Sequence, residues 1–173
     1  MSASEIERTL VRLAHEILEK NDGTAGLGFV GIRKRGVPLA ERLAHIISRI
    51  EKSAVPVGAL DVTPYRDDLT AHGPKPAAEK NEIGFPITDL NIILVDDVLY
   101  TGRTARAAMD ALFQHGRPKR VQLCVFVDRG HRELPIEATF VGRQIQTMPQ
   151  EFVKIQLKEV DSEEKVVLME PQV

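Results

Sequence analysis

Two adjacent carboxylates and a threonine-rich segment contain the residue types of this chain best suited to chemistry. Asp96 and Asp97 follow an apolar run, and Thr101-Gly102-Arg103-Thr104 comes shortly after them. Glycine allows a backbone to approach a phosphate closely, threonine hydroxyls can donate hydrogen bonds to it, and the amino end of a following helix adds N–H donors and a positive dipole. Carboxylates only accept hydrogen bonds, so they suit ribose hydroxyls, directly or through a hydrated magnesium ion.

The same segment also fits a plain turn between a strand and a helix. Two aspartates at the end of a strand are common, and the four residues after them carry little information by themselves. A plain turn has no need of Tyr100 and Arg103, so their presence favours a binding site. From the residue types alone, a phosphate site and a turn remain about equally compatible with this segment.

A second candidate segment is basic. Arg33-Lys34-Arg35-Gly36 lies between a predicted strand and a predicted helix. Three cations beside a glycine at the carboxyl end of a strand would neutralise the charge of a departing pyrophosphate. The alternative is a solvated basic turn, which most charge runs are.

The elements that must position these segments alternate between strands and helices. Ser4 and Glu7 predict a capping box at the start of the first helix. Apolar runs and their spacing predict strands over 27–32, 55–62, 91–95, 121–127 and 138–141, helices over about 38–50 and 104–115, and a C-terminal hairpin over 153–157 and 166–169. This order predicts an α/β fold with a mostly parallel sheet, flanked by helices, and with binding loops at the carboxyl ends of the strands.

Composition limits the class of protein. The 173 residues suit one domain over 1–173, 43% of them are hydrophobic, and the single cysteine, Cys124, lies in an apolar run where a buried thiol is expected. No run is long enough to cross a bilayer and the first residues lack a signal pattern, so a cytoplasmic protein without a membrane partner is expected. A net charge of −2 restricts nucleic-acid binding to a local basic patch.

The segment over about 63–88 breaks the alternation. It is polar, contains four prolines and has no sustained period. A loop of this length is usually a lid or a binding loop, or else it is disordered. We therefore predict a long flexible loop here.

Residues 92–104 resemble the thirteen-residue motif with which type I phosphoribosyltransferases bind phosphoribosyl pyrophosphate (PRPP). Together with residues 12–16, 30–36, 65–69 and 127–136, they resemble PyrR, a family of uracil phosphoribosyltransferases that also regulate pyrimidine operons. The resemblance extends from residue 12 to about residue 143. It implies the type I phosphoribosyltransferase fold and conversion of uracil and PRPP into UMP and diphosphate. Orotate or a purine is a weaker alternative to uracil.

The resemblance also implies roles for individual residues. Asp96, Asp97 and Arg35 would be catalytic, and Mg²⁺ would be bound through PRPP, with Asp96 and Asp97 as further possible ligands. The PRPP motif comprises Ile92, Ile93, Leu94, Val95, Asp96, Asp97, Val98, Leu99, Tyr100, Thr101, Gly102, Arg103 and Thr104. The pyrophosphate loop comprises Arg33, Lys34, Arg35 and Gly36; the flexible loop carries Tyr65, Arg66, Asp67 and Asp68; and the base pocket comprises Val127, Asp128 and Arg129.

A second role follows from the resemblance alone. PyrR proteins can bind an mRNA leader hairpin and attenuate transcription when a uridine nucleotide such as UMP or UTP is bound, which here would involve Arg12, His15, Arg132 and Arg143. Glu137 replaces an arginine of the family pattern and Val11 a threonine. A carboxylate repels phosphates, so RNA binding could be lost with catalysis retained. The opposite alternative, an RNA attenuator with vestigial catalysis, also stays open. The resemblance further implies a homodimer or a larger homo-oligomer.

Overall fold

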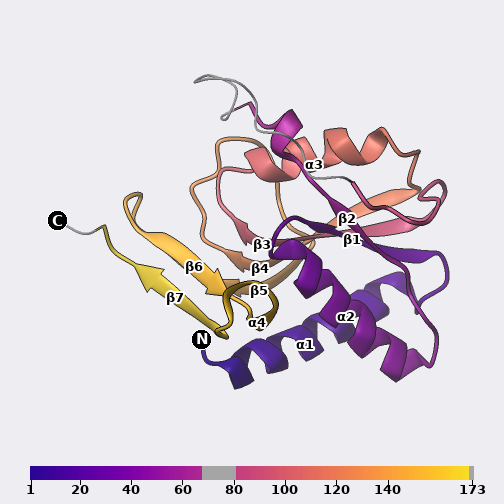
Figure 1. The fold of residues 1–173 in the computed structure, drawn as a ribbon, viewed down its shortest axis with the longest axis horizontal. Coiled ribbons are helices and arrows are strands. Elements are labelled where there is room, and N and C mark those ends of the chain that lie inside the picture. The colour runs from indigo at the N-terminus through magenta and orange to yellow at the C-terminus, as the bar shows by residue number, and fades with distance from the viewer. Residues whose placement is uncertain (68–80, 172–173) are drawn as a thin grey trace.

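A parallel five-stranded sheet forms the centre of the protein, in a computed structural model that describes residues 1–67 and 81–171 (Figure 1). The strand order is β2-β1-β3-β4-β5, and each neighbouring pair is parallel. The strands are β1 Leu27–Ile32, β2 Val57–Leu60, β3 Asn91–Leu99, β4 Arg120–Asp128 and β5 Phe140–Gln144. The predicted parallel sheet is therefore confirmed, although several predicted strand ends are wrong by a few residues.

Helices cover both faces of this sheet. Helices α1 (Ala3–Asn21) and α2 (Gly36–Glu51) lie on one face, and α3 (Arg103–Phe113) lies on the other (Figure 1). Successive strand residues alternate between the two layers: Ile93 packs with α1 and α2, and Leu94 with α3. Burial on both faces explains why the strands read as continuous apolar runs.

The first helix begins two residues earlier than predicted. Ser2 is its N-cap: the Ser2 hydroxyl accepts a hydrogen bond from the Glu5 N–H at 3.4 Å, and the Ser2 N–H donates to Glu5 Oε2 at 2.7 Å. The predicted box of Ser4 and Glu7 is wrong because the same spacing occurs twice in this stretch. Met1 exchanges hydrogen bonds with Val166 of β7 (Lys165–Met169), which fixes the chain immediately before the earlier box.

The strand that carries the two carboxylates is longer than predicted. β3 continues through Asp96 and Asp97, and Leu99 still pairs with Asp128 of β4. Each aspartate accepts a hydrogen bond from the next backbone N–H, at 2.9 Å for Asp96 Oδ1 and 2.8 Å for Asp97 Oδ1. The predicted end at Val95 is wrong because these side chains satisfy backbone donors within the strand. Both carboxylates are consequently held by the sheet and not by a loop.

The chain ends in the predicted hairpin. β6 (Phe152–Gln156) and β7 are antiparallel, and a short helix, α4 (Lys158–Asp161), occupies the connection where a simple turn was expected. The described parts of segment 63–88 hold a 3₁₀ turn, η1 (Thr63–Tyr65), and one isolated bridge between Ala59 and Glu82. The predicted site residue Asp68 lies outside the described residues. Over 1–67 and 81–171, no helix has the length and apolar character needed to span a membrane.

Substitution of Gly36 by alanine should destabilise this arrangement. A Cβ at Gly36 would lie 2.4 Å from the backbone oxygen of Val95, so α2 would have to shift away from β3. We expect Gly36→Ala to lower the free energy of unfolding by about 1–3 kcal/mol, measured by urea denaturation. Gly84→Ala is the control, because a Cβ there meets no atom within 4 Å. Equal stability of the two variants would contradict the close contact.

Candidate functional site

A cavity of about 340 Å³ lies where β3 runs into α3. Its lining consists of Asp96, residues 98–105, Arg66 and Glu133. The structure thus brings the buried carboxylate and the threonine-rich turn around one space. A larger hollow of about 650 Å³ lies beside residues 129–131 and 144–147. We place the candidate site in the smaller cavity because it contains both the carboxylate and the start of a helix.

The turn between β3 and α3 is suited to an anion. Gly102 has φ 92°, a left-handed conformation that glycine adopts readily, and it is the N-cap of α3. The Arg103 N–H donates to the Thr101 hydroxyl at 3.3 Å. The first turn of α3 has backbone donors without helical partners and the positive end of the helix dipole. These features fit a phosphate group.

Asp96 is the least solvated charged group of the cavity. Only 8% of its surface is exposed. Burial raises the pKa of Asp96 well above its usual range, the neighbouring charge of Asp97 raises it further, and Arg66 opposes the shift in part. An ionised Asp96 is therefore energetically costly. Hydroxyl donors or a cation from a ligand would stabilise its charge.

Arg103 links three segments around the cavity. Its Nη1 donates to Asp67 Oδ2 at 2.7 Å and its Nε to Glu133 Oε2 at 2.8 Å. The start of the predicted flexible loop is thus ion-paired to the predicted PRPP motif. Glu133 was missing from the predicted site residues. The only sequence signal for Glu133 was its place in segment 127–136, which carries part of the PyrR resemblance.

The predicted base-pocket residues lie at the end of β4 and directly after it, beside the turn. Burial alone would raise the pKa of Asp128, but hydrogen bonds from Arg132 and the Gly130 N–H, with the charge of Arg132, lower it. Arg132 also donates to the backbone oxygens of Tyr100 at 2.9 Å and Ile136 at 2.8 Å. Arg132, predicted to contact RNA, therefore holds the loops of the site together.

Arg129 connects the same loop to Tyr100. Its guanidinium carbon lies 4.0 Å from the centre of the Tyr100 ring, and only 5% of the residue is exposed. Its nitrogens donate to the Thr147 hydroxyl and to the Met148 oxygen, both at 3.2 Å. A cation–π contact of this kind fixes the orientation of both side chains. The guanidinium of Arg129, predicted to belong to the base pocket, thus packs on the ring of Tyr100 in this structure.

The basic loop lies at the same edge of the sheet. β1 and β3 are adjacent and parallel, with Gly31 opposite Val95, so the residues that follow them are neighbours. Lys34 is exposed, whereas Arg35 is paired with Asp161 of α4. The Asp161 hydrogen bond is the main cause that raises the pKa of Arg35, and Asp97 contributes as well. Arg35 thus lies within electrostatic reach of the carboxylate pair.

The other residues predicted to bind RNA gather elsewhere. Arg12 on α1 pairs with Glu16 and donates to the backbone oxygens of Val141 and Gly142 in β5. Arg143 of β5 lies 3.6 Å from Glu5 of α1, and His15 is exposed on α1. The structure therefore places Arg12, His15 and Arg143 on the α1–β5 side, apart from the loop that holds Arg132.

The stability of the protein should depend on the charge of Asp96. Its pKa is raised in the folded state, so its stabilising contribution is complete below about pH 4 and is lost as the pH rises through the raised value. Asparagine keeps the acceptor for the Asp97 N–H and removes the buried charge. We expect Asp96→Asn to raise the melting temperature at pH 8 by roughly 3 °C or more, and to lose this advantage towards pH 4, in calorimetric scans. A variant less stable than wild type at pH 8 would show that the charge is not costly.

Comparison with known proteins agrees with this geometry. The family described as phosphoribosyl transferase domain matches residues 2–160. The protein named Bifunctional protein PyrR from Thermus aquaticus is 56% identical over 170 residues, which cover 98% of this chain and 94% of the relative. The protein of the same name from Pelotomaculum thermopropionicum is 55% identical over 165 residues, covering 95% and 91%.

A solved structure supports the fold. Hypoxanthine phosphoribosyltransferase from Trypanosoma cruzi superposes with a TM-score of 0.76 at 19% identity, covering 98% of this chain and 93% of the other. At this identity the likeness establishes architecture and not substrate. The predicted type I phosphoribosyltransferase fold is confirmed. By its sequence and its fold, this chain belongs to the phosphoribosyl transferase family and, within that family, to the PyrR proteins.

Proposed function

We propose that this chain is a uracil phosphoribosyltransferase, a single domain over 1–173 that converts uracil and PRPP into UMP and diphosphate. The observation that carries the proposal is one cavity shared by a buried carboxylate and a helix-capping threonine–glycine turn. Identity of 56% to proteins named Bifunctional protein PyrR supports uracil over orotate or a purine.

Each loop of the site takes one part of PRPP in this proposal. The turn over 101–104 binds the 5′-phosphate through backbone N–H groups and hydroxyls. Asp96 and Asp97 accept hydrogen bonds from the two ribose hydroxyls. Lys34 and Arg35 neutralise the pyrophosphate, and the backbone over 127–129 binds the edge of the base. These groups hold uracil for attack on the anomeric carbon while the bond to pyrophosphate breaks.

A magnesium ion fits this site only if PRPP supplies part of its ligands. Within residues 1–67 and 81–171, no cluster of three or more His, Cys, Asp or Glu side chains is placed to bind a metal. Asp96 and Asp97 are the oxygen donors that Mg²⁺ prefers, and PRPP and water would complete its shell. When bound, the ion would neutralise charge on the pyrophosphate.

The start of the predicted flexible loop lies at the same site. Arg66 lines the cavity and Asp67 is paired with Arg103. We infer that Tyr65, Arg66 and Asp67 help to cover PRPP, which would exclude water from the activated sugar.

A second function, regulation through RNA, is favoured by the gathering of Arg12, His15 and Arg143 on the α1–β5 side. Neighbouring cations on one surface can neutralise successive phosphates of a leader hairpin. Glu137, the unfavourable replacement, belongs to the loop of Arg132 and not to this side. We propose that this side contacts RNA when UMP or UTP is bound. Assembly into a homodimer or larger oligomer and a cytoplasmic location stay predictions.

An assay with radiolabelled bases tests the catalytic proposal. With PRPP and Mg²⁺, the protein should form UMP from uracil, and orotate and hypoxanthine should react at least about a hundredfold more slowly, because a site built for one hydrogen-bonding edge leaves polar groups unpaired with another. Arg35→Gln should lower the rate about tenfold or more, while Arg49→Gln, at the far end of α2, should not. Absence of UMP, or preference for another base, would contradict the proposal.

Filter binding to the leader RNA of its own pyrimidine operon, with UMP present, tests the second role. Arg143→Gln should weaken binding and reduce the salt slope by about one, because one phosphate contact is lost. Its UMP synthesis should be unchanged. Arg106→Gln on α3 is a matched control, since Arg106 is likewise exposed and paired with a carboxylate. Equal RNA affinity of Arg143→Gln and wild type would exclude this surface.

A further inference from the structure

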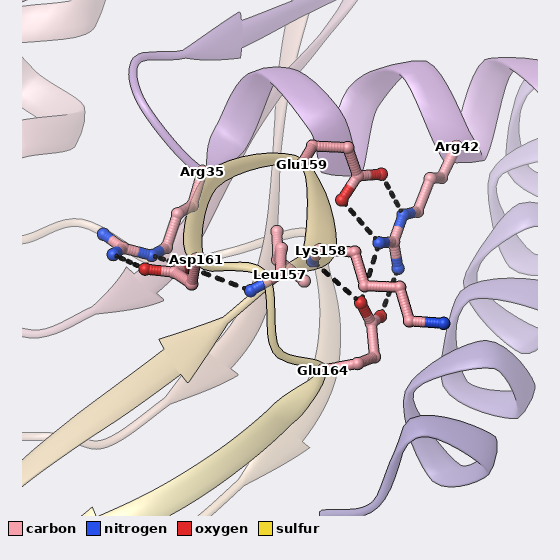
Figure 2. A network of polar contacts seen from close by, with 7 residues as sticks. All are labelled: Arg35, Arg42, Leu157, Lys158, Glu159, Asp161 and Glu164. Carbon is pink, nitrogen blue, oxygen red and sulfur yellow. Dashed lines mark hydrogen bonds and ion pairs between the residues drawn. The ribbon is translucent and has the colours of Figure 1, made fainter.

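Arg35 of the basic loop is bound by a carboxylate from the far end of the chain. Its Nη2 lies 2.6 Å from Asp161 Oδ1, and its Nε lies 3.1 Å from Asp161 Oδ2 (Figure 2). The two residues are 126 positions apart. This is the two-pronged geometry in which a guanidinium and a carboxylate fix each other's orientation.

The ion pair with Asp161 uses the Nε and Nη2 edge of the Arg35 guanidinium and leaves Nη1 outside the pair. Nη1 of Arg35 makes no hydrogen bond within the part of the chain that the structure describes. Asp97 contributes to the raised pKa of Arg35, so the guanidinium lies in the field of the carboxylates on β3. Arg35 therefore lies between α4 and the candidate site, and its Nη1 group is available to donate hydrogen bonds to a ligand.

The Asp161 carboxylate is itself held in place. Its Oδ2 also accepts a hydrogen bond from the Leu157 N–H at 2.9 Å, across the turn of α4. The hydrogen bond from Arg35 is the main cause that lowers the pKa of Asp161, so its charge persists at neutral pH. Only 14% of its side chain is exposed. A fixed, ionised partner of this kind restricts the rotamers of a long side chain.

A separate clamp already fastens α4 to α2. Arg42 donates to both oxygens of Glu159, at 2.7 and 2.6 Å, and to both oxygens of Glu164, one of them at 3.0 Å (Figure 2). Glu164 also accepts from the Lys158 N–H at 3.1 Å. Attachment of α4 therefore does not require Arg35. The Arg35–Asp161 pair lies at the start of α2, about two helical turns from this clamp.

We propose that Asp161 is a positioning residue of the pyrophosphate loop. Asp161 binds Nε and Nη2 of Arg35, so that Nη1 is directed to the pyrophosphate of PRPP. Helix α4 holds Asp161 in the position that this contact requires. The inference rests on the proposed function, because it assigns Arg35 to pyrophosphate. It adds a residue from the C-terminal hairpin to a site that is otherwise built from the first four strands and the loops after them.

Calorimetric titration with inorganic pyrophosphate and Mg²⁺ tests the inference, together with steady-state kinetics for PRPP and uracil. Asp161→Asn keeps the size of the side chain and removes its charge. We expect roughly three- to tenfold weaker binding of pyrophosphate and a similar rise in KM for PRPP, with KM for uracil within about twofold of wild type. Glu159→Gln is the matched control: it weakens the Arg42 clamp on the same helix and should leave pyrophosphate binding within about twofold.

A double-mutant cycle shows whether Asp161 acts through Arg35. In an Arg35→Gln background, Asp161→Asn should have no further effect, and Asp161→Glu alone should restore part of the affinity lost in Asp161→Asn. Unchanged or tighter pyrophosphate binding in Asp161→Asn, an equal loss in Glu159→Gln, or additive effects in the cycle would overturn the inference. So would Arg35→Gln with wild-type affinity for pyrophosphate.

The two proposals fail in distinguishable ways. Pyrophosphate binding that depends on Asp161 in a protein that makes no UMP would support the positioning role and reject the uracil assignment. Normal UMP formation with pyrophosphate binding that is indifferent to Asp161 would reject the positioning role alone.

Discussion

A carboxylate buried at the carboxyl end of the central strand is the constraint on which the rest of the site depends. Asp96 cannot be exposed without pulling β3 from between β1 and β4, because its neighbours pair with both strands. Its charge is poorly solvated, and its nearest carboxylate repels it. This buried charge lowers the stability of the folded protein, and a ligand that offers hydroxyl groups or a cation would offset that cost. Ligand binding is thereby favoured at the carboxyl end of β3, where Asp96 lies.

The surrounding loops follow from that strand. β1 and β4 flank β3 in parallel, so the loops after all three strands meet at one edge. Side-chain contacts then join the loops after β3 and β4: Arg103 donates to Glu133, Arg132 donates to the Tyr100 backbone, and Arg129 packs on the Tyr100 ring. From the sequence alone, these charged residues would be expected to bind a ligand. In this protein a large share of the basic side chains near the site position its loops.

Sequence patterns predicted the features that depend on local or periodic information. The parallel sheet, the helix that begins at the Gly102 turn and the C-terminal hairpin all follow from apolar spacing and turn residues. Two local predictions were wrong because a local rule was ambiguous: the cap spacing of Ser2 occurs twice, and aspartates that bond their own backbone can continue a strand. The pairing of Arg35 with Asp161 could not be predicted, since it depends on where a distant hairpin packs.

A crystal structure with PRPP and Mg²⁺ would show whether the two carboxylates and the turn over 101–104 bind the activated sugar. In that complex the ribose hydroxyls should lie within hydrogen-bonding distance of the carboxylates of Asp96 and Asp97. The N–H groups over 101–104 should hold the 5′-phosphate. PRPP bound in the hollow beside residues 129–131, or with its 5′-phosphate in the loop over 33–36, would contradict this placement.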